Sequence, residues 1–77
     1  MRKFTIQFVS QESQPEGWTV FIDLLPVVVV DSPREALDIA LEMAQRDCAF
    51  HRRPTVVMVQ PGDSKPAILV QEYCVTD

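Results

Sequence analysis

The stretch SPREALDIALEMAQRDC, residues 32–48, decides the fold because it carries the strongest helix signal in the chain. Ser32 is the predicted N-cap, Pro33 suits the first helical position, and Glu35 completes the spacing of a capping box. Apolar residues then recur three and four positions apart, as on one face of a helix. We therefore expect a helix that ends at about residues 47–48, with a broad apolar face and a narrow polar stripe.

Short apolar segments on both sides of this helix predict β-strands, several with alternating apolar and polar residues. The order β-β-β-α-β-β follows, and we expect an α+β fold in which a single helix packs on a four- to five-stranded, mainly antiparallel sheet. In a variant of this prediction, the second and third strands form one long strand kinked at Pro26. The predicted strands are residues 4–8, 18–25, 27–30, 55–60 and 67–75.

The segments between the strands have the composition of loops and turns. Residues 10–17 are polar with one proline and one glycine, and Pro61-Gly62-Asp63-Ser64 is typical of a tight turn. By contrast, residues 27–30 are four consecutive valines. A wholly apolar run of this length predicts a central strand that is buried on both faces.

Composition limits the chain to one small domain, residues 1–77, with 47% hydrophobic and 23% charged residues. Its net charge of −4 argues against nucleic acid as a partner, because phosphate binding needs a basic surface. The first residues enter a strand pattern at once and the apolar runs are short, so we expect neither a secretory signal nor a membrane partner.

Cys48 and Cys74 lack the C-x-x-C spacing of redox and zinc motifs. Secreted domains of this size usually hold several disulfides, so we interpret both cysteines as reduced, buried thiols of a cytoplasmic protein. A single disulfide between them is the alternative.

Charged side chains form two groups around the predicted helix. Glu35, Asp38 and Glu42 share its polar face, which is typical of a solvated surface and, alternatively, of an acidic docking face. A basic group follows at the helix end, where cations complement the helix dipole. An anion site is the alternative for this group, which consists of Arg46, His51, Arg52 and Arg53.

Catalytic and metal sites have little support in the sequence. Cys48 and His51 lie three positions apart, a weak signal for a nucleophile and its base, and Cys74 would add a third metal ligand without a diagnostic spacing. Glycine occurs only at Gly17 and Gly62, so no phosphate loop is present. We expect no enzyme activity, no cofactor and no metal.

The sequence holds more apolar residues than one helix can cover. A helix covers one face of a sheet, and we expect it to cover the row of alternating residues Trp18, Val20, Ile22 and Leu24. Phe21 and Leu25 alternate away from this row, and Ile39 and Met43 border the apolar face of the helix. These four residues are the candidate interface, and we expect a protein partner or a homodimer to cover them. Alternatively, the loop at residues 10–17 covers the second face.

Two resemblances to known proteins also favour a protein-binding function. The segment GWTVFIDLLP, residues 17–26, followed by SPREAL, residues 32–37, resembles HicB-type antitoxins over about residues 3–45. That family has glycine, a strand, Leu-Pro, a short strand, a Ser/Thr cap and Glu-Ala-Leu. Here the spacing after Pro26 is shorter, no Gly-Asp precedes the cap, and no DNA-binding module follows. The resemblance implies a domain that blocks a small toxin. In general character, the chain is also similar to small bacteriophage proteins that mask a host protein.

Overall fold

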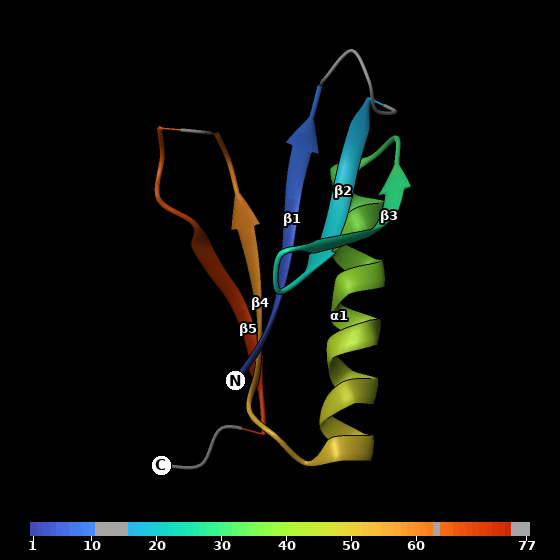
Figure 1. Ribbon diagram of the computed structural model, residues 1–77, viewed down its shortest axis with the longest axis vertical. Helices are drawn as coiled ribbons and strands as arrows, with labels where there is room; N and C mark the ends of the chain where they lie inside the picture. The colour runs from blue at the N-terminus through green and yellow to red at the C-terminus, as the bar shows by residue number, and fades with distance from the viewer. Residues whose placement is uncertain (11–15, 63, 75–77) are drawn as a thin grey trace.

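In a computed structural model, the described residues form one helix packed on a five-stranded sheet, which confirms the predicted α+β class and element order (Figure 1). The structure describes residues 1–10, 16–62 and 64–74. Residues 11–15 of the predicted loop, Asp63 of the predicted turn and Val75 of the predicted last strand lie outside them. The elements are β1 (Arg2–Val9), β2 (Gly17–Ile22), β3 (Leu25–Val30), α1 (Pro33–His51), β4 (Thr55–Gln60) and β5 (Ile68–Tyr73).

The strands lie in the order β3-β2-β1-β4-β5, so the first strand of the chain occupies the centre of the sheet. The pairs β1–β2, β2–β3 and β4–β5 are antiparallel, whereas β1 and β4 are parallel. The parallel pair requires a crossover between strands, and α1 supplies it. The sheet is therefore mixed, with the antiparallel pairings in the majority as predicted.

The helix begins as its sequence predicts and ends later. Ser32 Oγ accepts a hydrogen bond from the Glu35 amide at 3.5 Å, which confirms the N-cap. At the other end, Arg52 adopts the left-handed conformation with φ 51° and donates its amide to the Cys48 carbonyl at 2.8 Å. This cap extends the helix to His51, beyond the predicted end at residues 47–48.

The core lies between α1 and one face of the sheet. Alanines buried at every fourth position of α1 let the helix approach the strands closely. The row of Trp18, Val20 and Ile22 packs against the helix, as expected. Leu24, predicted in the same row, lies in the turn between β2 and β3 and is 95% exposed. The most buried core residues are Phe4, Ile6, Val20, Ala36, Ala40, Ala44 and Val57.

The valine run at residues 27–30 belongs to β3, which is an edge strand and not the predicted central one. The prediction was wrong because apolarity on both faces of a strand does not reveal how many neighbours the strand has. A turn at Asp23 and Leu24 separates β2 from β3, so the two are not one kinked strand. Pro26 lies beside an irregularity in the β2–β3 register, at the sheet edge, where its missing N–H is tolerated.

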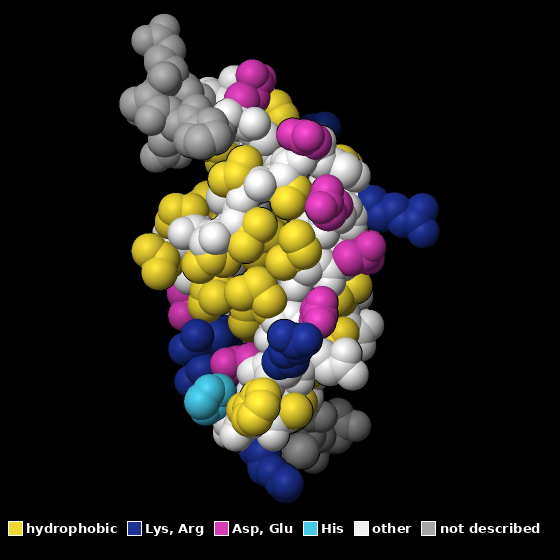
Figure 2. Space-filling view, turned by 90° about the vertical axis from the view of Figure 1, so that its right-hand side faces the viewer, with side chains coloured by type: hydrophobic (Ala, Val, Ile, Leu, Met, Phe, Trp, Pro, Cys, Tyr) yellow, Lys and Arg dark blue, Asp and Glu magenta, His cyan; other side chains and the backbone are white. Residues whose placement is uncertain are grey.

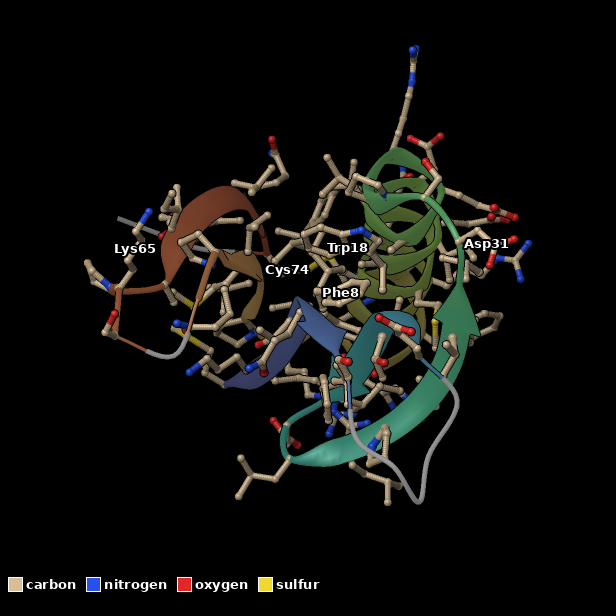
Figure 3. All side chains as sticks on the ribbon, turned by 90° about the horizontal axis from the view of Figure 1, so that it is seen from above. Phe8, Trp18, Asp31, Lys65 and Cys74 are labelled. Atoms are coloured by element: carbon tan, nitrogen blue, oxygen red, sulfur yellow. A yellow bond between two sulfur atoms is a disulfide. The ribbon has the colours of Figure 1, made fainter. Side chains whose placement is uncertain are left out.

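The two cysteines are joined by a disulfide, so the interpretation as reduced thiols is wrong (Figure 3). Cys48 lies near the end of α1 and Cys74 directly follows β5, with Cα atoms 5.9 Å apart. The sequence places them 26 positions apart, and only the packing of β5 beside the helix brings them together. The expectation of a cytoplasmic protein rested partly on reduced thiols and loses that support.

Candidate functional site

A continuous hydrophobic surface lies where the edge strand β3 meets the side of α1. Figure 2 shows hydrophobic side chains gathered at the centre of this side of the molecule, with acidic side chains along one border and basic side chains with the histidine below. We call it the β3–α1 surface. Its residues are exposed Leu25 and half-buried Ile22, Val28, Val30, Ile39 and Met43.

Helix phase and strand register place these residues together. Met43 lines the same groove as Ile22, and Ile39 lies one turn earlier on the same side of α1. Val28 pairs with Val20, whose side chain is buried beneath the helix. Directly opposed residues in an antiparallel pair share a face, so the register puts this part of β3 on the helix side of the sheet.

The structure therefore divides the four candidate interface residues between two faces. Leu25 was predicted to lie with Phe21 on the face away from the helix, and this was wrong. The chain turns back at residues 23–24, so Leu25 pairs with Ile22 and joins Ile39 and Met43 around the β3–α1 surface. Phe21 instead pairs with Thr5 on the opposite face, where it is half-buried. Among the described residues, no second layer covers that face (Figure 1).

The predicted acidic face is exposed on α1 beside this surface. Glu35, Asp38 and Glu42 are exposed and recur at helical spacing. Glu42 accepts a hydrogen bond from Arg46 at 2.7 Å, an exposed pair one turn apart that contributes little to stability. The acidic residues thus form a charged border to the hydrophobic centre.

Asp47 is the centre of a partly buried polar cluster that connects the end of α1 to the sheet. Its side chain is only 10% exposed and accepts two hydrogen bonds from Arg53, at 3.0 Å from Nε and 2.9 Å from Nη2. Thr55 Oγ1 donates a third at 3.3 Å. Nε of Arg2 and Nε2 of His51 each lie 4.0 Å from Asp47 Oδ1.

These cations perturb the titration of Asp47. The hydrogen bond from Arg53 holds the pKa of the Asp47 carboxyl below its ordinary value of 3.8. Burial acts in the opposite direction, and the positive charges of Arg53, Arg2 and His51 add to the lowering. Asp47 is therefore ionised wherever the protein is near neutral pH.

The four residues of the candidate anion site have separate surroundings. Arg46 pairs with Glu42, Arg53 is held by Asp47, and Arg52 lies beside the disulfide. Only His51 borders the groove next to the β3–α1 surface without a close hydrogen bond among the described residues. Arg2 lies beside His51 at the groove. The sequence did not predict this neighbour, because the parallel pairing of Arg2 in β1 with Thr55 in β4 brings it there.

Two further groups of hydrophobic side chains lie elsewhere on the sheet, one on the edge strand β5 and one where β1 pairs with β2. Ile68, Leu69 and Val70 of β5 are exposed, and Phe8 packs edge to face on Trp18 with ring centroids 5.7 Å apart (Figure 3). The second half of β5 carries exposed Gln71 and Glu72, so its apolar stretch is short.

Within the described part of the chain, no three His, Cys, Asp or Glu side chains are grouped so that they could hold a metal ion. No helix in these residues is long and apolar enough to cross a membrane. No protein-family model matches the sequence, and no curated protein or solved structure matches it significantly. The resemblance to HicB-type antitoxins thus stays a prediction.

Proposed function

We propose that this chain is a protein-binding domain whose partner covers the β3–α1 surface, as an accessory or inhibitor protein would mask its target. The observation that carries the proposal is the gathering of hydrophobic side chains beside an edge strand (Figure 2). Contiguous exposed apolar surface of this kind marks interaction sites in soluble domains.

The surroundings of the surface resemble the anatomy of a protein interface. Its hydrophobic centre is bordered by Glu35, Asp38 and Glu42 on one side and by Arg2 and His51 at one end. A charged rim around an apolar centre is typical of such interfaces, and opposite charges on two borders orient a partner.

The strand β3 adds a second means of binding. It pairs only with β2 among the described residues, so one side of its backbone is free to accept a partner strand. Pro26 lacks an N–H, which limits the available ladder to residues 27–30. We therefore expect a short added strand, with side chains of the partner packing against Ile39 and Met43.

A matched pair of variants tests the surface. Leu25→Lys and Leu69→Lys each place a charge on an exposed leucine, 65% and 50% exposed, at opposite edges of the sheet. Quantified cross-linking in the cells that make the protein should show at least tenfold loss of the partner for Leu25→Lys alone. Ultracentrifugation of the purified chain shows whether the partner is a second copy.

Two results contradict the proposal. If Leu69→Lys removes the partner and Leu25→Lys does not, the β5 edge is the interface. If Phe21→Lys alone removes it, the partner binds the opposite face. The thermal midpoint of each variant, measured in parallel, separates lost binding from lost folding.

A second candidate of the same class is an antitoxin that blocks a small toxin. One observation favours it: the residues that carry the resemblance form β2, a turn, β3 opening with Leu25-Pro26, and α1 capped by Ser32. Co-expression distinguishes the two functions. An antitoxin restores growth to cells that express the toxin encoded beside it, and a binding domain of another kind does not.

A further inference from the structure

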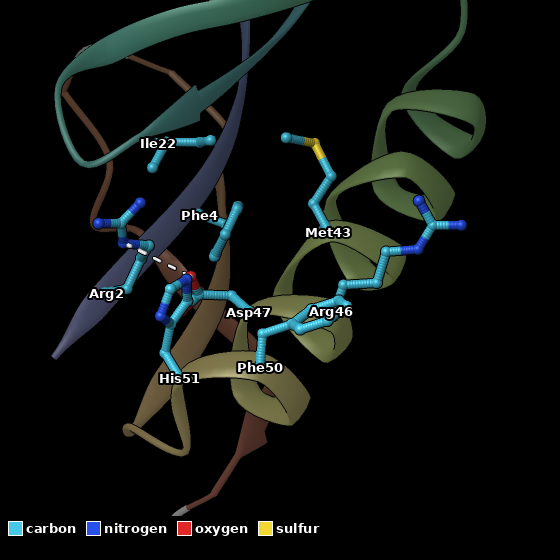
Figure 4. A pocket seen from close by; sticks show the side chains of 8 residues that line it. All are labelled: Arg2, Phe4, Ile22, Met43, Arg46, Asp47, Phe50 and His51. Carbon is cyan, nitrogen blue, oxygen red and sulfur yellow. Dashed lines mark ion pairs between the residues drawn. The ribbon is translucent and has the colours of Figure 1, made fainter.

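At the lower end of the β3–α1 surface lies a groove with an apolar floor and a charged rim. Its volume is about 260 Å³, and it opens between β1, the end of β2 and the last turns of α1. Phe50, 81% exposed, stands at its outer side. Figure 4 shows the lining residues, which are Arg2, Phe4, Ile22, Met43, Arg46, Asp47, Phe50 and His51.

Cationic and imidazole side chains outnumber carboxylates among the described residues that line the groove. Asp47 is the only carboxylate among the lining residues that the structure describes, and Arg53 already binds both of its oxygens from outside the groove. Arg2 forms a long ion pair with Asp47, with Nε 4.0 Å from Oδ1 (Figure 4). This distance is beyond hydrogen-bond range, so the guanidinium donors of Arg2 remain able to bind a second carboxylate. Because its side chain is only 31% exposed, attraction between Arg2 and an added anion is screened less than at an open surface.

His51 provides a second donor on the same rim. Its Nε2 lies 4.0 Å from Asp47 Oδ1, and its side chain is largely exposed. Arg46 is different, because it extends away from the groove and is paired with Glu42 (Figure 4). The groove therefore offers apolar contacts at Met43 and Phe50 with two donors, Arg2 and His51, near one another at the rim.

We propose that this groove binds the C-terminal residue of a partner protein, with a hydrophobic side chain on the floor and the terminal carboxylate on Arg2 and His51. Arginine favours carboxylates because its donors match their geometry. The volume is below the roughly 300–1,000 Å³ of pockets for drug-sized ligands, which suits one side chain. The inference rests on the proposed function, since Ile22 and Met43 belong to both the groove and the β3–α1 surface.

Methionine methyl resonances provide a direct test on the purified protein. Met43 lines the groove, whereas Met58 pairs with Thr5 on the opposite face and serves as an internal control. The probes are the tripeptide acetyl-Gly-Gly-Leu with a free carboxylate, its C-terminal amide, octanoate and inorganic phosphate. We expect the free acid to shift the Met43 signal saturably, at least tenfold more tightly than the amide, without moving Met58.

Variants identify the residues that bind the carboxylate. Arg2→Gln should reduce the affinity for the free acid to that for the amide, and Arg52→Gln, outside the groove, should leave it unchanged. An unchanged Met58 signal shows that each variant remains folded.

Several outcomes would overturn the inference. Equal affinities for acid and amide exclude a carboxylate site, tighter octanoate binding identifies a fatty-acid site, and a response to phosphate alone identifies a simple anion site. If no peptide binds while Leu25→Lys still abolishes partner binding, the groove proposal fails and the proposed function stands. If the acid binds and Leu25→Lys has no effect on the partner, the β3–α1 surface fails instead.

Discussion

Breaking the Cys48–Cys74 disulfide should remove a large part of the stability of this domain. The two cysteines are 26 positions apart, and closing a loop of that length lowers the entropy of the unfolded chain by an amount equivalent to about 3.5 kcal/mol at 25 °C. A domain of 77 residues typically has a free energy of unfolding of about 4–12 kcal/mol. The reduced protein should therefore retain a free energy of unfolding of only about 0.5–8.5 kcal/mol.

Thermal unfolding with and without a thiol reductant measures this effect. At about 4–8 °C per kcal/mol for a domain of this size, reduction should lower the midpoint by roughly 14–28 °C. The double variant Cys48→Ala, Cys74→Ala is the control, because it should unfold with the reduced protein and be insensitive to reductant. In a reducing compartment the domain would lack this stabilisation.

A midpoint that falls by less than about 5 °C would refute the reasoning, because the bond would then not constrain the unfolded chain as the loop length requires. Hydrogen exchange locates the effect. Since the disulfide fastens the end of β5 to α1, amides of β5 should lose protection first on reduction.

Three further predictions concern residues that stabilise the fold. Asp47→Asn should reduce stability at neutral pH and flatten its acid dependence. The folded-state pKa of Asp47 is lowered, so the stability that its ionised form contributes is fully present above the unfolded pKa near 3.8. This stability is lost as the pH falls through the folded-state pKa. The free energy of unfolding measured across acid pH tests the prediction. Gly17→Ala should destabilise the domain by about 1–3 kcal/mol, because an added Cβ would lie 2.8 Å from the Val30 carbonyl oxygen. The β3 amides should then exchange their hydrogens faster, and unchanged exchange rates in β3 would contradict this. Ser32→Ala should cost about 0.5–1 kcal/mol in urea unfolding, and an unchanged transition would mean that the 3.5 Å cap bond contributes nothing.

The elements of the fold were predictable because their signals are local. Ser32, Pro33 and Glu35 mark the start of α1 within four residues, and alternation in β1 and β2 identifies the face that packs on the helix. The end of α1 was predicted too early because Arg52 caps the helix in a left-handed conformation. Glycine is the usual residue at such a cap, so no signal for it was present in the sequence here.

The candidate site was only partly predictable because it depends on contacts distant in sequence. Ile39 and Met43 were identified from helical spacing, and their role in an interface stays a prediction; Met43 lines the groove beside Ile22. Arg2 was missed because the parallel register of β1 and β4 alone brings it to Asp47. The disulfide was missed for the same reason, since no spacing rule pairs cysteines across a helix and a hairpin.

The position of β3 at the edge of the sheet, where the sequence predicted a central strand, has a physical explanation that supports the proposed function. Residues 27–30 are apolar on both faces, a composition that suits a strand with neighbours on both sides, yet β3 has one neighbour among the described residues. A partner strand paired along β3 would move it into the interior of a six-stranded sheet. Val28 would stay against the helix side, and Val29, now 43% exposed, would gain cover from the partner. Protection of the β3 amides from hydrogen exchange on partner binding, with β5 unchanged as the opposite edge, is the result that this mode of binding requires.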